Sequence, residues 1–319
     1  MIRKDKYVVS STHLDSQGYV MAKSALESML PQLNGDRKPR LGLEHVRTYP
    51  PFGAIMNGEI SKGQDEHYYL TAEMVYFDKQ EFITLKDGTK LLKESFSEGE
   101  YPFIECGDNE IEKISIATDP ANFETHNEII EIHNAVRQES DLEFETNFFG
   151  RKSELPDPET IITITKILAT TLGIIKTKIP EKIGEAIGED LAQFYKLVSK
   201  LTIETIKKVR PSNRPKSFVI SYPNTECNIE LVITTHKADR VLNSLTKEKL
   251  QTIADKMELL INLEPEKIQF VYNDNDCWEF NYLLSKNGSV IGIIKSFDER
   301  NQRYNEILEK QNNEEKGNS

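Results

Sequence analysis

The chain has 319 residues and a net charge of −12 at pH 7, and 38% of its residues are hydrophobic while 29% are charged. These values indicate a globular protein of one or two domains with a substantial buried core. The excess of 52 acidic over 40 basic side chains argues against a general nucleic-acid-binding protein, because neutralising phosphates requires clustered Lys and Arg.

The cysteine and glycine residues argue against further classes of protein, namely metal-binding and nucleotide-cofactor-binding proteins. Cys106, Cys227 and Cys277 are far apart and form no CxxC pair, so the sequence predicts no metal site and fits a reducing, cytoplasmic location. Neither a GxGxxG nor a GxxxxGK[ST] loop occurs, so we expect no cofactor. The longest apolar region, 161–175, is interrupted by Lys166 and is too short to span a bilayer.

Residues 1–137 predict a β-rich N-terminal domain. Short runs rich in Val, Ile, Tyr and Leu alternate with Gly, Pro and Asn turns, which is typical of strands. A helix is expected from Ala22 to Leu33, and a second one, Phe123–Arg137, follows the strands. Six short strands with few helices predict a small, closed or nearly closed β-barrel. The expected strands are Tyr7–Ser11, Arg40–Glu44, Ala54–Ile60, Tyr68–Phe77, Tyr101–Cys106 and Glu112–Thr118.

Residues 138–210 predict an acidic linker and a helical connector. Two prolines within three residues, in Glu154-Leu-Pro-Asp-Pro158, indicate a domain boundary. A long helical region is expected from Pro158 to about Val209, with an apolar first half, and Pro180 should break or kink it.

Residues 211–310 predict a small α+β sandwich, so the fold class of the whole chain is α+β. The tail 311–319 is polar and is expected to be disordered. The predicted elements of the sandwich are strands Phe218–Tyr222, Asn228–Thr234, Lys267–Tyr272, Trp278–Leu284 and Val290–Lys295, with helices Lys247–Leu260 and Asp298–Lys310.

Four segments of the N-terminal domain, taken in chain order, form a recognisable pattern. It consists of short strands, one histidine at the end of a strand and one Pro-Pro-Phe-Gly turn. The segments are Tyr7–Gly18, Arg40–His45, Tyr49–Ile60 and Ile111–Asn122. In this order they resemble the prohead (capsid maturation) proteases of tailed phages, which are serine proteases on a small β-barrel similar to the herpesvirus assemblins. The resemblance covers roughly the first 125 residues and implies a protease-like domain there.

The resemblance assigns the general base to His45, which closes a short strand ahead of the proline-glycine turn. The nucleophile of the family is a serine on a later strand, but the best-fitting segment here, Tyr101–Gly107, contains no serine. Glu105 lies nearest the expected position with Cys106 beside it, and only one of these two can face His45 because successive strand residues point to opposite faces. Ser95 and Ser97 are further candidates, in what reads as a helix end or a loop.

The third catalytic group of the family is a glutamate two residues before the serine of a strand that continues into Pro-Ala-Asn. Ser115 and Pro120–Asn122 match this pattern, but Lys113 occupies the glutamate position and Glu112 is one residue away, on the opposite face. Lysine cannot accept a hydrogen bond from histidine. The sequence therefore predicts a protease-like scaffold with a degenerate catalytic site.

The resulting functional prediction is a protein-recognition or assembly protein linked to phage capsids or to phage sensing. One alternative is an active serine or cysteine endopeptidase of capsid maturation with His45 as base. Another is a membrane-acting effector that uses an apolar helix at 160–178. We expect a protein partner, either a capsid-type protein or a second copy in a homo-oligomer, because aromatic residues are favoured interface anchors. The aromatic residues that suggest this are Phe218, Tyr222, Phe270, Tyr272, Trp278, Phe280 and Tyr282.

Overall fold

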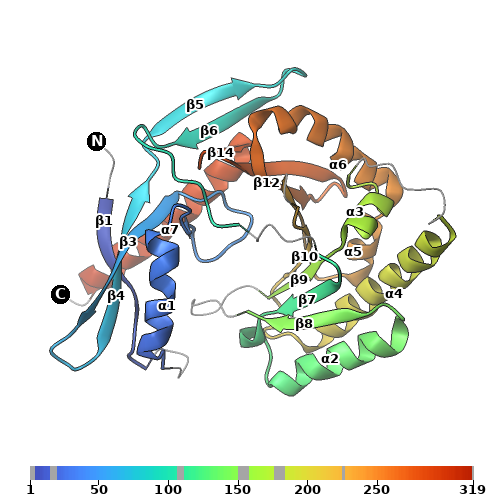
Figure 1. Cartoon of the computed structure of the whole chain (residues 1–319), viewed down its shortest axis with the longest axis horizontal. Coiled ribbons are helices and arrows are strands. Elements are labelled where there is room, and N and C mark those ends of the chain that lie inside the picture. The colour runs from blue at the N-terminus through green and yellow to red at the C-terminus, as the bar shows by residue number, and fades with distance from the viewer. Residues whose placement is uncertain are drawn as a thin grey trace. The chain divides into compact units, whose positions relative to one another are not determined.

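The fold is known from a computed structural model, which describes residues 4–14, 20–105, 111–149, 158–175, 184–224 and 227–317. It is a mixed α and β structure, as predicted (Figure 1). The chain divides into two compact units, each described by itself: unit 1 is Met1–Glu105 with Tyr282–Ser319, and unit 2 is Cys106–Asn281. The structure thus divides the chain at other positions than the predicted boundaries near residues 137 and 210, because the last part of the chain packs with the first.

The first half of unit 1 is a four-stranded antiparallel sheet in the order β1-β4-β3-β2. Helix α1 packs on it, burying Leu26 and Leu33 against Leu70 and Ala72. This order leaves β1 and β2 at open edges, so the described strands form no closed barrel of the predicted kind. The elements are β1 (Lys4–Ser11), α1 (Lys23–Asn34), β2 (Arg40–Leu41), β3 (Gly53–Lys62) and β4 (Tyr68–Tyr76).

The second half of unit 1 joins two distant parts of the sequence. The hairpin of β5 (Lys79–Thr84) and β6 (Lys90–Ser95) pairs through β6 with β14 (Val290–Gly292). Strand β14 also pairs with the end of β13 (Trp278–Ser285), and α7 (Ile294–Gly317) follows it. The predicted disordered tail is thus helical as far as Gly317.

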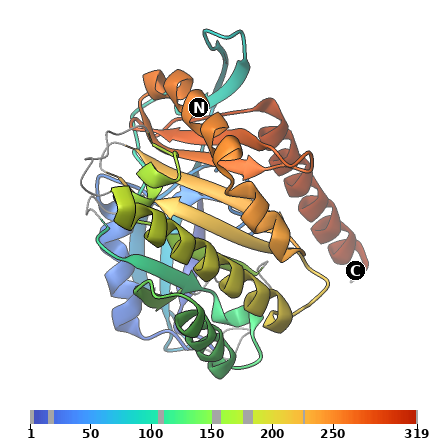
Figure 2. The same ribbon diagram turned by 90° about the vertical axis from the view of Figure 1, so that its right-hand side faces the viewer.

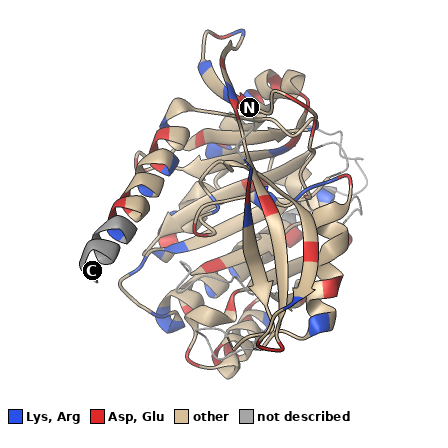
Figure 3. Cartoon of the chain, turned by 90° about the vertical axis from the view of Figure 1, so that its left-hand side faces the viewer, with Lys and Arg blue, Asp and Glu red and all other residues tan. Residues whose placement is uncertain are grey.

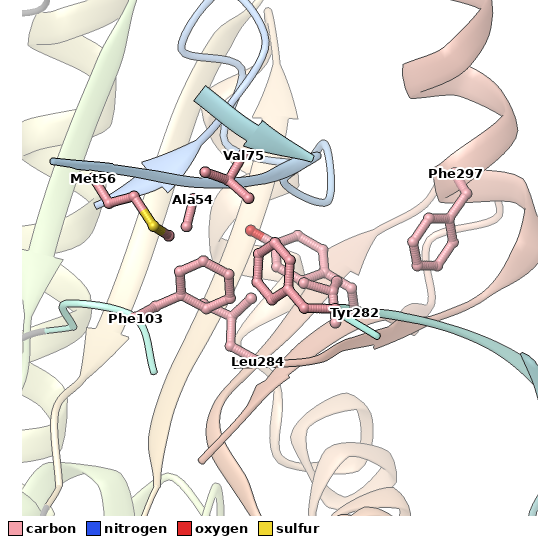
Figure 4. Close-up of a cluster of buried hydrophobic side chains, with 9 residues drawn as sticks. Ala54, Met56, Val75, Phe103, Tyr282, Leu284 and Phe297 are labelled. Atoms are coloured by element: carbon pink, nitrogen blue, oxygen red, sulfur yellow. The ribbon is translucent and has the colours of Figure 1, made fainter. Parts of the chain in front are cut away.

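One hydrophobic cluster ties these pieces together (Figure 4). Phe103 and Tyr282, both almost fully buried, meet side chains of β3 and β4 and of the C-terminal segment. Tyr282 also donates a hydrogen bond from its hydroxyl to the backbone oxygen of Arg47, at 3.1 Å. The core members are Ala54, Met56, Val75, Phe96, Phe103, Tyr282, Leu284, Val290 and Phe297.

Helix α7 is anchored by a buried ion pair. Acidic and basic residues alternate along its surface (Figure 3), but Arg300 points inward and is 2% exposed. Its guanidinium makes two hydrogen bonds to the carboxylate of Glu94, at 2.9 and 3.1 Å, and a third to the backbone oxygen of Pro51 at 2.8 Å. It also lies over the ring of Phe52, 4.1 Å from the ring centre. Every part of this buried charge therefore has a partner, as burial of an ion requires.

Unit 2 is a mixed sheet whose strands run in the order β12-β11-β10-β9-β7-β8, with the first residues of β13 beside β12. Three pairs of neighbouring strands are parallel, and helices connect the strands of each pair. These helices cover one face of the sheet (Figure 2). The strands are β7 (Ile114–Thr118), β8 (Phe144–Phe148), β9 (Glu159–Thr163), β10 (Lys216–Tyr222), β11 (Asn228–Thr235) and β12 (Pro265–Tyr272). The helices are α2 (His126–Glu139), α3 (Lys166–Thr171), α4 (Gly184–Lys208), α5 (Ala238–Ser244) and α6 (Lys247–Leu260), with short 3-10 turns at Pro120–Asn122 and Ile261–Leu263.

The prediction of a long helical region from Pro158 is wrong for its first residues. Residues Glu159–Thr163 form β9, which lies between β7 and β10, and the first helix after it has only six residues. A strand with neighbours on both sides and both faces buried reads as a continuous apolar run, which local periodicity cannot distinguish from a buried helix. The apolar helix expected at 160–178 as a membrane-acting segment is therefore absent from the described residues up to 175.

The prediction that seven aromatic residues of the C-terminal part serve as interface anchors is also wrong, because each of them is buried and at most 6% exposed. They lie at alternating positions along their strands and therefore on one face of the sheet. The opposite side carries a buried polar network: Lys267 pairs with Glu230 at 2.8 Å, and Gln269 bridges Glu230 and Asn281 at 3.0 and 2.7 Å.

Candidate functional site

His45, the predicted base, lies in the turn between β2 and β3 and is exposed. The expected strand Arg40–Glu44 ends at Leu41, because Glu44 and His45 both have left-handed backbone conformations, with φ of 48° and 58°. The turn is held from α7, where the guanidinium of Arg303 binds the carboxylate of Glu44 at 2.7 and 2.8 Å.

The described part of the predicted nucleophile segment, from Tyr101 to Glu105, also belongs to unit 1. Glu105 forms an ion pair with Arg40 at 3.4 Å, and its side chain is 6% exposed. Cys106 lies outside the described residues. Of the two further serine candidates, Ser95 is the last residue of β6 rather than part of a helix end or loop, and Ser97 donates a hydrogen bond from its hydroxyl to Asp78 at 2.7 Å.

Ser115 and Glu112 belong to unit 2. Ser115 lies on β7, next to the edge strand β8, and is paired with Glu145 of β8 on one side and Thr163 of β9 on the other. Glu112 precedes the strand and is exposed. Lys113, at the position of the family's glutamate, forms an exposed ion pair with Glu143 at 3.3 Å. The candidate catalytic residues are thus distributed over both units, and a catalytic constellation remains a prediction.

The sequence interpretation missed a compact group of chemically active side chains in unit 1, around the turn between β3 and β4. The Nε2 atom of His13 lies 2.9 Å from the Oδ2 atom of Asp65 and 2.8 Å from the hydroxyl of Tyr69. Tyr69 in turn donates a hydrogen bond to the same Oδ2 atom of Asp65, at 2.5 Å. Three atoms that can hold protons or a metal ion thus lie within 2.9 Å of one another. We call this group the His13–Asp65–Tyr69 triangle.

A second histidine supports the triangle. The rings of His13 and His67 stack with their centres 3.9 Å apart, and Nδ1 of His67 lies 3.3 Å from the hydroxyl of Thr12. The hydrogen bond from Tyr69 lowers the pKa of the Asp65 carboxyl below its usual value, and the same bond raises the pKa of the Tyr69 phenol. At neutral pH the triangle therefore contains a carboxylate and a neutral phenol.

The sequence does contain a signal for this group. Asp65, His67 and Tyr69 follow one another at every second position, the spacing that places side chains on one face of an extended chain. In the structure Tyr69 is on β4, while Asp65 and His67 lie in the turn before it, where Glu66 has a left-handed backbone conformation with φ of 67°. Their partner His13 is brought to them by the pairing of β1 with β4, in which Ser11 lies opposite Tyr69.

Two open hollows lie in unit 2. The larger, of about 720 Å³, is at the carboxyl ends of the parallel strands β11 and β12, the edge where α/β sheets often bind ligands. Arg240 crosses it and donates to the backbone oxygen of Asn273 at 2.6 Å, with Asp274 and Asp276 at 3.4 and 3.3 Å. This arginine consolidates the β12–β13 turn, and the exposed Lys237 is the other basic side chain among the described residues that line the hollow. The smaller hollow, of about 440 Å³, lies between Lys113 and Arg137 and includes Phe144.

Exposed aromatic side chains lie on three strands that pair on one side only. Strand β1 pairs with β4, β5 with β6 and β8 with β7, and no other partner for them is found in the described part of the chain. Tyr7 on β1 is 44% exposed, Phe82 on β5 is 69% exposed, and Phe148 on β8 is 51% exposed.

None of the protein-family models, curated proteins or solved structures compared with this chain matches it. Among the described helices, none is long and apolar enough to cross a membrane. Within the same residues, no group of three or more His, Cys, Asp or Glu side chains is arranged to hold a metal ion.

Proposed function

We propose that this protein acts by recognising another protein through the open edges of its sheets. The observation that carries the proposal is the exposed aromatic residue on each of the strands β1, β5 and β8. An unpaired strand edge presents N–H and C=O groups to which a partner strand can add, and proteins that do not use such an edge protect it with charge, proline or a covering element. Strands β1 and β5 also carry charged residues, including Lys4, Lys6 and Lys79. The exposed aromatic residue on each of the three edges nevertheless supplies a side-chain anchor for a strand that adds there.

The kind of partner follows from the resemblance to prohead proteases. That family works on capsid assemblies, so we propose a capsid-type protein, or a second copy of this chain, as the partner. The lysine at position 113 supports recognition over cleavage, because an ammonium group cannot orient the imidazole of a catalytic histidine.

Placing a lysine beside an open edge is expected to weaken association without unfolding the protein. We expect Phe82→Lys, and separately Phe148→Lys, to reduce self-association or capsid-protein binding about tenfold or more, because losing an aromatic anchor costs on the order of 2 kcal/mol. Thermal unfolding should change little, since an exposed substitution is within about 0.5 kcal/mol of neutral. Sedimentation velocity and light scattering measure the association.

The matched control is Ile130→Lys, which introduces the same charge at a 47% exposed apolar residue of α2, away from any strand edge. It should leave association unchanged. A protein that remains monomeric and ignores candidate capsid proteins would contradict the proposal, as would equal losses in the control.

The endopeptidase alternative predicts a different result. Incubation of the purified protein with a capsid or scaffold protein should leave that protein intact if the chain only recognises it. Cleavage that disappears in His45→Ala would instead establish the protease, with His45 as its base. Mass spectrometry of the incubated mixture distinguishes the two.

A further inference from the structure

The His13–Asp65–Tyr69 triangle has the chemistry of a metal site whose third donor is a phenol. Imidazole nitrogen with carboxylate and phenolate oxygen is a donor set suited to divalent ions of the first transition row. The described His, Cys, Asp and Glu residues form no such site among themselves, and Tyr69 supplies the donor that they lack. The side chains of His13 and Asp65 are 42% and 43% exposed, so an ion can enter from solvent.

The distances require only a small adjustment. Donor atoms about 2.1 Å from a tetrahedral metal ion lie roughly 3.4 Å from one another. The three atoms of the triangle are 2.5 to 2.9 Å apart, so each pair needs to open by less than about 1 Å. Half-exposed side chains on a turn can make this movement without a change in the sheet.

The hydrogen bonds also leave ring nitrogens available. No described residue makes a hydrogen bond to Nδ1 of His13, because both polar contacts of that ring are made by Nε2. The Nε2 proton can therefore move to Nδ1 through solvent while Nε2 binds a metal ion. His67 stacks on this ring and limits its rotation, which is the usual role of residues around a metal ligand.

We propose that Nε2 of His13, the carboxylate of Asp65 and the phenolate of Tyr69 bind one divalent transition-metal ion of the zinc or copper type. Water fills the remaining position. Binding breaks the hydrogen bond from Tyr69 to Asp65 and releases the phenol proton to solvent, so affinity rises with pH. The sequence predicted no metal centre, because these residues have no metal-ligand spacing along the chain.

Gly63 allows the triangle to form. A β-carbon at this position would lie 2.5 Å from the Oδ1 atom of Asp65 and 2.5 Å from the ring of Tyr69. Gly63→Ala therefore displaces two donors while leaving every donor in the chain. This substitution therefore tests whether the positions of the donor atoms, and not only their presence in the chain, determine metal binding.

The test is calorimetric titration of the full chain with Zn²⁺, in a Cys106→Ser/Cys277→Ser background that removes competing thiols, beside an ultraviolet difference spectrum for tyrosinate. We expect one ion per chain, a tyrosinate signal, and a loss of affinity of about tenfold or more in Asp65→Asn, Tyr69→Phe and Gly63→Ala. His45→Gln and His126→Gln, which change exposed histidines elsewhere, should bind as the parent does.

Circular dichroism verifies that each variant is folded. The absence of binding in the parent chain would overturn the proposal. Binding of equal strength in Tyr69→Phe, or binding without a tyrosinate signal, would also overturn it, because the phenolate is the donor that defines this site.

Discussion

Replacing Arg300 with alanine is expected to lower the free energy of unfolding by about 3–5 kcal/mol, because it leaves the carboxylate of Glu94 buried without its cation. Glu94 is 3% exposed, and Arg300 supplies two of its hydrogen bonds, while Gln80 supplies a third at 2.7 Å. The same change removes the hydrogen bond to Pro51 that positions the loop before β3. Urea denaturation followed by circular dichroism measures the loss.

Arg303→Ala is the matched control, since it removes the same group one turn further along the same helix. Arg303 also pairs with a glutamate, Glu44, but its side chain is 32% exposed. An exposed ion pair is worth at most about 1 kcal/mol, so this variant should lose far less stability. Similar losses in the two variants would contradict the assignment of Arg300 as a buried anchor.

A double substitution tests whether the pair itself stabilises unit 1. The variant Glu94→Gln/Arg300→Met removes both charges of this pair. We expect much of the stability lost in Arg300→Ala to return, because well-packed neutral side chains often replace a buried ion pair without loss.

The elements with the clearest local pattern could be predicted from the sequence. Helix α6 has the predicted bounds, Lys247–Leu260, and the strands expected at Phe218–Tyr222 and Lys267–Tyr272 lie within β10 and β12. Each is a short run of β-branched and aromatic residues, or a helix-spaced apolar face, bounded by turn residues. Their side chains face a core that these elements largely build themselves.

Elements whose identity depends on distant neighbours were predicted less well. Strand β9 is a strand because β7 and β10 lie on its two sides, and the hairpin of β5 and β6, which was not predicted, pairs with β14 about 200 residues later in the chain. No local pattern shows that the segment from Tyr282 onward completes the core formed by Phe103 and Val75. Unit 1 combines the first and last parts of the chain for the same reason.

The candidate sites show the same limit. His45 was expected to close a strand ahead of the proline-glycine turn, and neither its place in a turn with left-handed residues nor the attachment of that turn to Arg303 could be predicted. Asp65 and Tyr69 are four positions apart, but His13 is 56 positions from Tyr69, and only the register between β1 and β4 brings it there. His13, which follows β1, could therefore be recognised as part of a site only once the pairing of β1 with β4 was known.

The protein is also expected to lose about 2 to 3 kcal/mol of stability through one histidine as the pH falls from 6.5 to 4. His133 on α2 is 3% exposed, its Nε2 atom has no hydrogen-bond partner in the described part of the chain, and Phe144 lies against it with ring centres 6.3 Å apart. Burial lowers the pKa of His133 to about 4, and the positive charge of Arg137 acts in the same direction. In the unfolded chain the same imidazole takes up its proton near its ordinary pKa of 6.5. Between these two values the unfolded state binds more protons than the folded one, so stability is fully present above pH 6.5 and declines below it.

His133→Leu removes this titration and the buried polar atom together. The variant should be at least as stable as the parent at pH 7.5, because a buried nitrogen without a partner is costly, and it should lose less stability between pH 6.5 and pH 4.5. His126→Leu, an exposed histidine at the start of the same helix, is the control and should retain the full decline. Urea denaturation at a series of pH values measures all three proteins. Parallel curves of stability against pH for His133→Leu and the parent would show that His133 takes up its proton without unfolding α2. That result would contradict the assignment of His133 as a buried, neutral imidazole.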